Sequence, residues 1–183
     1  MEVARYAIQA LTDRRSEVVN AVTLSTYTGM RVEETTCLKV KNIRFEKGEF
    51  EFGYVVIVKG PEGGAKGGRP RFIPIIDKEA QGALRSITAG KKPDDYVVAR
   101  VDGENMTPDN VSDKLCEVLK EEYGDKYLYN GCHGLRKTWA QRYYNLVRPN
   151  HTKSQAVGKT NAVLGHGYNR GSSGLKRYVA NMW

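Results

Sequence analysis

Several features that define common protein classes are missing or rare in this chain of 183 residues. No apolar run approaches the roughly 20 residues that a membrane-spanning helix needs, and the first residues do not form the apolar stretch of a secretory signal. The three cysteines, Cys37, Cys116 and Cys132, are odd in number and far apart, so they do not predict a disulfide framework. These absences predict a cytoplasmic protein with reduced thiols.

Motifs of several enzyme classes are also absent. There is no Cys-x-x-Cys, no His-Glu-x-x-His and no Gly-x-Ser-x-Gly, and the chain has only three histidines. A zinc site or a serine hydrolase is therefore not predicted. Five glycines lie in the segment 60–68, but Lys66 is followed by Gly67 instead of the Ser or Thr of a nucleotide-binding loop. We expect no metal and no cofactor.

Positive charge is plentiful. The chain has 29 Lys and Arg against 21 Asp and Glu, which gives a net charge of +8 and a pI of about 9.4. The segment from Arg136 to Arg177 contains nine basic residues and no acidic one. A basic segment of this kind favours a phosphate-bearing partner, DNA or RNA, although a merely soluble basic surface is the alternative.

Periodicity predicts mainly helices. We expect a first helix over 16–28 with Ser16 as its N-cap, and a second over 31–38 after the break at Gly29. A third should begin at Thr107-Pro108, since Pro is favoured in the first helical turn. The apolar residues Leu135, Trp139, Tyr143 and Leu146 predict an amphipathic helix that ends at Pro149. A last helix is expected over 172–180.

Strand character is confined to residues 43–75. The segment 44–50 suggests two strands with a turn at Lys47-Gly48, and the β-branched run 54–58 and the segment 71–75 predict further strands. No repeat or long linker divides the chain. The prediction is one mainly α domain over 1–183 with a small antiparallel three-stranded β-sheet.

Two short motifs contain candidate phosphate ligands. Arg31 follows Gly29 at a break between helices, and Glu34 could hold its guanidinium. Considered alone, this pair is more often a surface ion pair. His133 and Arg136 lie near the start of the predicted amphipathic helix, where an anion is favoured. Considered alone, they are more often a solvated helix start.

Three further candidates belong to loops or to the C-terminal part. Lys66 lies in the glycine-rich segment, where it is a possible proton donor or part of a plain surface turn. Leu164-Gly165-His166 is followed by Tyr178. A lone tyrosine is usually structural, and a phenol attacks well only where cations stabilise its anion. Tyr168 is the rival nucleophile, but it lies only two residues after His166.

Taken in order, these motifs resemble the catalytic domain of the tyrosine recombinases, the phage integrase family. Thr28-Gly29-Met30-Arg31 with Glu34 is similar to the first-arginine box, and Lys66 in Lys-Gly-Gly-Arg-Pro-Arg-Phe-Ile-Pro to the β-hairpin lysine. His133-Gly134-Leu135-Arg136, Leu164-Gly165-His166 and Tyr178 resemble the remaining boxes. The resemblance covers nearly the whole chain.

The resemblance implies DNA strand cleavage and rejoining through a 3′-phosphotyrosyl intermediate, without metal or ATP. Arg31 and Arg136 would clamp the phosphate, His133 would accept the tyrosine proton, Lys66 would protonate the leaving oxygen, and His166 would donate a hydrogen bond. Glu34 would orient Arg31, and Tyr178 would be the nucleophile. The implied partners are double-stranded DNA and other subunits of a tetrameric synapse, with no membrane, in a bacterial or phage protein at the nucleoid. Further candidate DNA contacts are Lys59, Arg69, Arg71, Lys137, Arg142, Lys176 and Arg177.

Two features depart from the family pattern. Nothing in the chain corresponds to the usual N-terminal DNA-binding domain, and Tyr178 lies 12 residues after His166, a longer interval than is usual. Two other functions stay open beside the recombinase: a non-catalytic DNA-binding protein of recombinase ancestry, and a type IB topoisomerase with the same chemistry.

Overall fold

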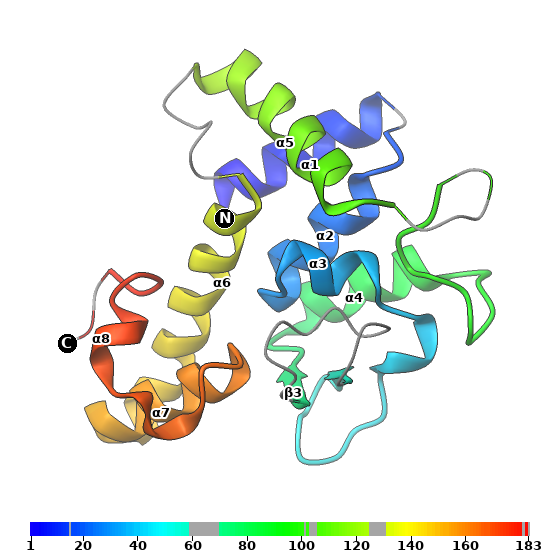
Figure 1. Ribbon diagram of the computed structural model, residues 1–183. Coiled ribbons are helices and arrows are strands. Elements are labelled where there is room, and N and C mark those ends of the chain that lie inside the picture. Colours follow the sequence, from blue (N-terminus) through cyan, green and yellow to red (C-terminus); the bar gives the residue numbers. More distant parts are fainter. Residues whose placement is uncertain are drawn as a thin grey trace.

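The computed structural model describes residues 1–14, 16–58, 70–100, 102, 106–124, 131–180 and 182. Helices predominate in this part of the chain, and three short strands form one sheet (Figure 1). The α-helices are α1 (Glu2–Asp13), α2 (Val19–Thr28), α3 (Val32–Thr36), α4 (Lys78–Thr88), α5 (Pro108–Tyr123), α6 (Gly131–Val147), α7 (Lys153–Val163) and α8 (Ser172–Leu175). The 3-10 helices are η1 (Val40–Asn42), η4 (Arg148–Asn150) and η5 (Tyr168–Arg170), and the strands are β1 (Ile43–Arg44), β2 (Tyr54–Ile57) and β3 (Arg71–Pro74).

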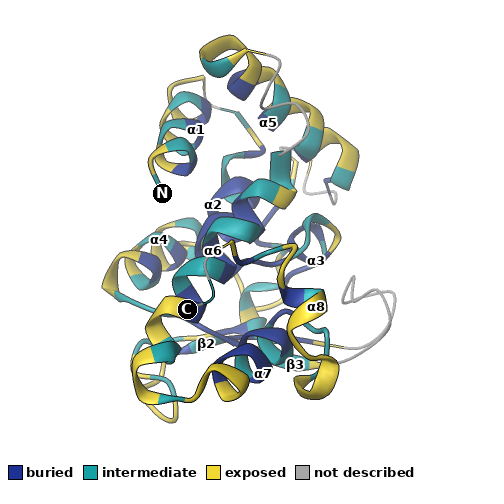
Figure 2. Cartoon of the chain, turned by 90° about the vertical axis from the view of Figure 1, so that its left-hand side faces the viewer, coloured by how far each residue is buried: buried dark blue, intermediate teal, exposed yellow. Residues whose placement is uncertain are grey.

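Helices α2 and α6 pack against each other through the centre of the molecule (Figure 2). Every residue of α2 from Ala21 to Thr28 is buried, as expected for a helix enclosed on all sides. From α6, Leu135, Trp139 and Tyr143 are buried as predicted, and Trp139 stacks on Tyr143 with ring centroids 5.3 Å apart. Leu146, predicted to be part of the same stripe, is 53% exposed instead, whereas the next residue, Val147, packs against the core.

The sheet has the antiparallel order β1-β2-β3, with Val55 opposite both Ile43 and Ile73. These three side chains are buried, whereas Phe72 on the other face of β3 is 56% exposed. Side chains alternate between the two faces of a strand, so the inner face joins the core beside α7. The predicted class, mainly α with a three-stranded antiparallel sheet, is confirmed.

Three further local predictions were wrong. The segment 45–53 contains turns and bends instead of a strand, because its Glu, Lys and Gly residues favour strands weakly. The first central helix begins at Val19, and its N-cap Val18 makes no side-chain cap hydrogen bond, so Ser16 is not the cap. The last helix ends at Leu175 instead of Ala180, and the Ala180 N–H donates to Gln141 Oε1 at 2.9 Å, outside the helical pattern.

Other helices either confirm predictions or were missed. Thr107 caps α5 with Pro108 in its first turn, and α6 gives way to a 3-10 turn containing Pro149, both as predicted. Helices α1, α4 and α7 were not predicted, although α4 has an Asp77 cap and α7 a capping box at Thr152. Among the described residues, no helix combines the length and the apolarity that crossing a membrane requires.

Candidate active site

The first part of the site is the turn between α2 and α3. Gly29 ends α2 with a φ of 62°, a left-handed conformation that favours glycine. A Cβ at this position would lie 2.5 Å from a ring carbon of Trp139, so the turn also needs a residue without a side chain. Arg31 follows as the extended N-cap residue of α3. The close packing of Gly29 on the buried Trp139 indole therefore determines where Arg31 lies at the start of α3.

Gly29→Ala tests this turn, and we expect it to destabilise the protein by about 2–4 kcal/mol, since both backbone strain and overpacking oppose the new methyl group. The measurement is the free energy of unfolding in urea. Gly82→Ala is the matched control, because Gly82 lies within α4 and a Cβ there would meet nothing within 4 Å. That variant should gain about 0.5–1 kcal/mol. Equal effects at the two positions would contradict the role given to Gly29.

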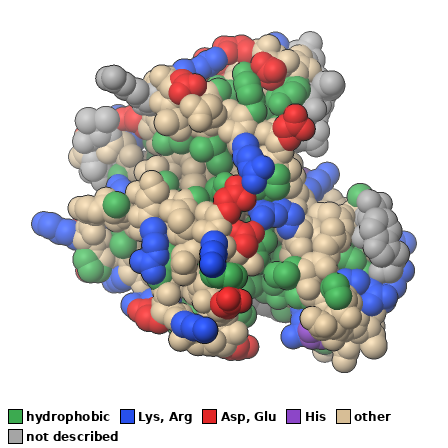
Figure 3. All heavy atoms as spheres, turned by 180° about the vertical axis from the view of Figure 1, so that it is seen from behind, with side chains coloured by type: hydrophobic (Ala, Val, Ile, Leu, Met, Phe, Trp, Pro, Cys, Tyr) green, Lys and Arg blue, Asp and Glu red, His purple; other side chains and the backbone are tan. Residues whose placement is uncertain are grey.

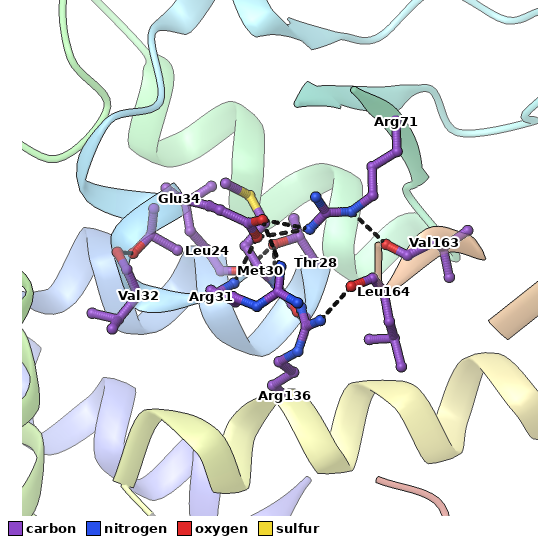
Figure 4. A network of polar contacts seen from close by, with 12 residues as sticks. Leu24, Thr28, Met30, Arg31, Val32, Glu34, Arg71, Arg136, Val163 and Leu164 are labelled. Carbon is purple, nitrogen blue, oxygen red and sulfur yellow. Dashed lines mark hydrogen bonds and ion pairs between the residues drawn. The ribbon is translucent and has the colours of Figure 1, made fainter. Parts of the chain in front are cut away.

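Glu34 is the buried centre of the polar network in Figure 4. Its carboxylate accepts from the Arg31 backbone N–H at 2.9 Å and from Arg31 Nη1 at 3.1 Å. The predicted contact between Glu34 and Arg31 is therefore present. Arg71 Nη2, from β3, donates to both carboxylate oxygens, at 2.8 and 2.7 Å. One carboxylate thus serves two guanidinium groups.

Arg136 enters the same region from α6 and is 2% exposed. Its guanidinium donates to the carbonyl of Gly29 and, at 2.6 Å, to that of Leu164, while Nε is buried without a partner among the described residues. Burial and, next, the charge of Arg31 lower the pKa of Arg136 to about 10, so it stays charged at neutral pH. Three arginines and one carboxylate leave a net positive charge, which suits an anion.

Tyr178 lies beside both predicted histidines. The centroid of its ring is 5.1 Å from that of His133 and 5.0 Å from that of His166, and Arg136 Cζ lies 5.4 Å from the ring. His133 comes from the first turn of α6, and His166 follows the end of α7. Four residues predicted from three separate motifs are thus brought together.

Both histidines favour the neutral form. Burial, followed by the charges of Lys137 and Arg136, lowers the pKa of His133 below its ordinary value. Burial and then the charge of Arg136 lower the pKa of His166 to about 4. At neutral pH both imidazoles are therefore uncharged, and each offers one acceptor nitrogen and one donor N–H.

Tyr168, the rival nucleophile, lies elsewhere. Its ring packs against Gly158 of α7, where an added Cβ would approach the ring to 2.7 Å. The side chain is 48% exposed. Unlike Tyr178, its ring makes no ring contact with His133 or His166 among the described residues. The geometry therefore favours Tyr178 as the reacting phenol.

A cleft of about 380 Å³ opens beside these groups. Arg31, His133, Arg136 and Tyr178 all line it, whereas Arg71 does not. The cleft gives a phosphate access to the two arginines, the neutral His133 and the phenol. Such an arrangement can stabilise a five-coordinate phosphorus and accept a phenol proton.

The predicted DNA contacts fall into three groups. Lys59, Arg69 and the predicted acid Lys66 lie outside the described residues. Lys137, Arg142, Lys176 and Arg177 line one surface hollow together with Tyr178, and no acidic residue lines it; Arg142 also pairs with Asp77 at 2.6 Å. Acidic and basic side chains are interspersed on the face shown in Figure 3.

Arg71 is the exception among these candidates. Its side chain is only 7% exposed and pairs with Glu34. Arg71 is therefore not placed where an exposed residue could contact DNA. Sequence reasoning missed the pairing of Arg71 with Glu34, and it also missed Gln141, which accepts the Ala180 N–H two residues after Tyr178. The one feature of the sequence that could have singled out Arg71 is its place in Lys-Gly-Gly-Arg-Pro-Arg-Phe-Ile-Pro, at the start of β3. Nothing in the local sequence pointed to Gln141.

The phage integrase family model matches residues 2–169, so the chain belongs to the phage integrase family. The match ends before Tyr178, and the choice of this tyrosine therefore rests on its geometry. A comparison with curated protein sequences gives no match.

Solved structures share the fold. The chain resembles XerA recombinase with a TM-score of 0.65 and 18% identity, over 97% of this chain and 58% of that one. It also resembles the Tn1549 transposon integrase in complex with circular intermediate DNA, with a TM-score of 0.59 and 17% identity over 89% and 53% of the two chains. For a complex of the same integrase with transposon right end DNA, the TM-score is 0.62 and the identity 14%, over 96% of this chain and 58% of that one. The chain thus spans little more than half the length of these proteins.

Proposed function

We propose that residues 1–183 form the catalytic domain of a site-specific recombinase that cleaves and rejoins double-stranded DNA. The observation that carries this proposal is the position of Tyr178, whose ring lies about 5 Å from both imidazoles and beside the Arg136 guanidinium. A phenol among neutral imidazoles and buried cations is suited to nucleophilic attack on a phosphodiester. A protein that only binds DNA has no need of this arrangement.

Cleavage is a transesterification. Tyr178 Oη attacks the phosphorus and forms a 3′-phosphotyrosine, while the bond to the 5′-oxygen breaks. His133 takes the phenolic proton, and Lys66 supplies a proton to the departing 5′-oxygen. A 5′-hydroxyl of a partner strand later attacks the phosphotyrosine, and the same proton transfers run in reverse. The phosphodiester is conserved as an ester throughout, so no external energy source is needed.

Charge stabilisation is the task of the arginines. Arg31 and Arg136 bind the non-bridging oxygens, and His166 donates a hydrogen bond to one of them. Glu34 fixes Arg31 through its backbone N–H and its guanidinium. Lys137, Arg142, Lys176 and Arg177, around the hollow beside Tyr178, contact backbone phosphates. Strand exchange requires several subunits. The proposal therefore includes assembly of four subunits into a synapse on DNA, at the nucleoid.

The decisive experiment uses duplexes with a randomised segment and a nick placed so that the short 5′-hydroxyl strand diffuses away after cleavage. We expect a fraction of the protein to become covalently linked to DNA and to remain so in a denaturing gel. Sequencing the linked DNA then defines a cognate duplex. If no duplex in the pool yields an adduct, the proposal is wrong. Relaxation of supercoiled plasmid without strand exchange would instead identify a topoisomerase.

The rate of adduct formation should depend on pH through His133. Because its pKa is lowered below the ordinary 6.5, the base is free at neutral pH, and the rate should fall only as the pH drops through that lowered pKa. Single-turnover rates between about pH 4.5 and 8 measure this acidic limb. In His133→Gln the rate should be low and the limb should disappear. An unchanged limb in that variant would assign the titration to another group.

A further inference from the structure

Arg71 makes contacts that the proposed chemistry does not use. Its side chain leaves β3 and reaches two other segments of the site (Figure 4). Nη2 donates to both oxygens of Glu34, at 2.8 and 2.7 Å, and Nε donates to the carbonyl of Val163 at 2.8 Å. The guanidinium also lies against Gly165, where a Cβ would be 3.1 Å from Nη1. One side chain therefore joins the hairpin, the Arg31 turn and the turn before His166.

The division of labour between Arg71 and Arg31 follows from their geometry. Arg71 Nη2 contacts both carboxylate oxygens, whereas the Arg31 guanidinium makes one longer contact of 3.1 Å. The Arg31 side chain is 24% exposed and lines the cleft, and that of Arg71 is 7% exposed and does not. Arg71 thus neutralises the buried carboxylate, and the Arg31 charge remains available to a phosphate.

The second contact of Arg71 acts on the other half of the site. Val163 and Leu164, at the end of α7, present consecutive carbonyls, one to Arg71 and the next to Arg136. Cations are favoured at a helix C-terminus because its carbonyls carry partial negative charge. His166 follows two residues after Leu164. The end of α7 therefore fixes Arg136 and His166 relative to the Arg71 guanidinium.

We propose that Arg71 is a positioning residue: it holds Glu34 so that Arg31 can bind the scissile phosphate, and it does not contact DNA itself. This inference rests on the proposed strand cleavage. Without Arg71, Glu34 is a buried carboxylate with Arg31 as its remaining ionic partner in this network, and Arg31 turns away from the cleft into that pair. An uncompensated buried charge strongly favours such a rearrangement.

The test compares four proteins with wild type: Arg71→Met, Arg71→Lys, Arg71→Met combined with Glu34→Gln, and the control Arg44→Met. Arg44 lies on β1 of the same sheet and is exposed. The substrate is the cognate duplex recovered from the randomised pool, at saturating concentration. We expect Arg71→Met to slow adduct formation about 10²-fold, as misplacement of a reacting group by about 1 Å does. Arg44→Met should react like wild type.

The double variant separates positioning from a general structural role. Glu34→Gln removes the charge that captures Arg31 and keeps an oxygen for the Arg31 backbone N–H. The combination should therefore react faster than Arg71→Met alone, and Arg71→Lys should lie between Arg71→Met and wild type. A double variant that is no faster than Arg71→Met overturns the proposal. If Arg71→Met does not fold, a rate for Arg71→Lys equal to that of wild type overturns it.

Two readouts do not depend on cleavage. The first is titration with inorganic phosphate, followed through the arginine Nε–H signals in NMR spectra. Phosphate binding should be weakened about tenfold in Arg71→Met, which corresponds to the loss of one hydrogen bond to a charged group. In the double variant, phosphate binding should be restored. Binding of non-cognate duplex should be unchanged. A direct DNA contact would instead lower duplex affinity and reduce the salt slope by about one, with the saturated rate unaffected. That result overturns the proposal, whereas absence of any adduct with wild type refutes the proposed function.

Discussion

Tyr178→Phe is expected to abolish the covalent protein–DNA adduct, which is the largest effect we predict. The substitution removes the Oη nucleophile and leaves the ring beside the imidazoles of His133 and His166. Val179 and Leu175 stay buried, and the Ala180 N–H still donates to Gln141, so folding and DNA binding should be retained. Denaturing gels with the cognate nicked duplex measure the adduct, and gel shifts measure binding.

Tyr168→Phe is the matched control. It removes the same atom from a tyrosine on the same side of His166 in sequence, but one that packs on Gly158 of α7. Adduct formation should persist in this variant. Loss of the adduct in Tyr168→Phe with retention in Tyr178→Phe would reverse the assignment of the nucleophile.

Arg136→Lys should lower the rate of adduct formation by about 10²–10³-fold, the range seen when one donor to a developing negative charge is removed. Arg136 donates to the Gly29 and Leu164 carbonyls at the same time as it faces the cleft. A lysine ammonium cannot reproduce this fixed fork of donors. Arg136 Nε is buried and has no hydrogen-bond partner within the described part of the chain, which supports the same conclusion, because an unsatisfied buried donor costs about 1–3 kcal/mol of stability. A phosphate oxygen would supply that partner.

The measurement is the single-turnover rate at saturating cognate duplex, with Arg85→Lys as the control. Arg85 is an exposed arginine on α4 whose guanidinium lies over the Phe45 ring, so the same substitution there should leave the rate unchanged. Arg136→Lys should also unfold at a lower temperature, because the two carbonyls lose well-aligned donors. A rate within threefold of wild type, on the order of 0.6 kcal/mol of barrier, would remove Arg136 from the phosphate site.

Local sequence was sufficient to predict those elements whose conformation depends mainly on neighbouring residues. Gly29 before Arg31, Thr107-Pro108 at a helix start and the 4-residue spacing of Leu135, Trp139 and Tyr143 each correspond to the observed element. The order of motifs expected from the family also grouped His133, Arg136, His166 and Tyr178, and the fold brings these four residues together in space.

Long-range contacts were beyond the reach of sequence reasoning. Arg71 and Glu34 are 37 residues apart and Arg136 and Gly29 are 107 apart, and no local pattern reveals which basic residue is buried. Arg71 therefore looked like one more surface cation. Helices α1, α4 and α7 were missed for a different reason. The caps of α4 and α7 and the small apolar face of α1, which consists of Ala4, Ala7 and Leu11, were present in the sequence but were not distinctive.

The Gly29 turn has a consequence for heat inactivation. Its carbonyl accepts from Arg136, and its Cα faces the indole of Trp139, which is fully buried between the two central helices. Arg136, which we propose binds the phosphate, is thus attached to the hydrophobic interior through Gly29. Loosening of the α2–α6 interface must displace Arg136 at once. The temperature at which the proposed strand cleavage fails should therefore coincide with the temperature at which the interior melts.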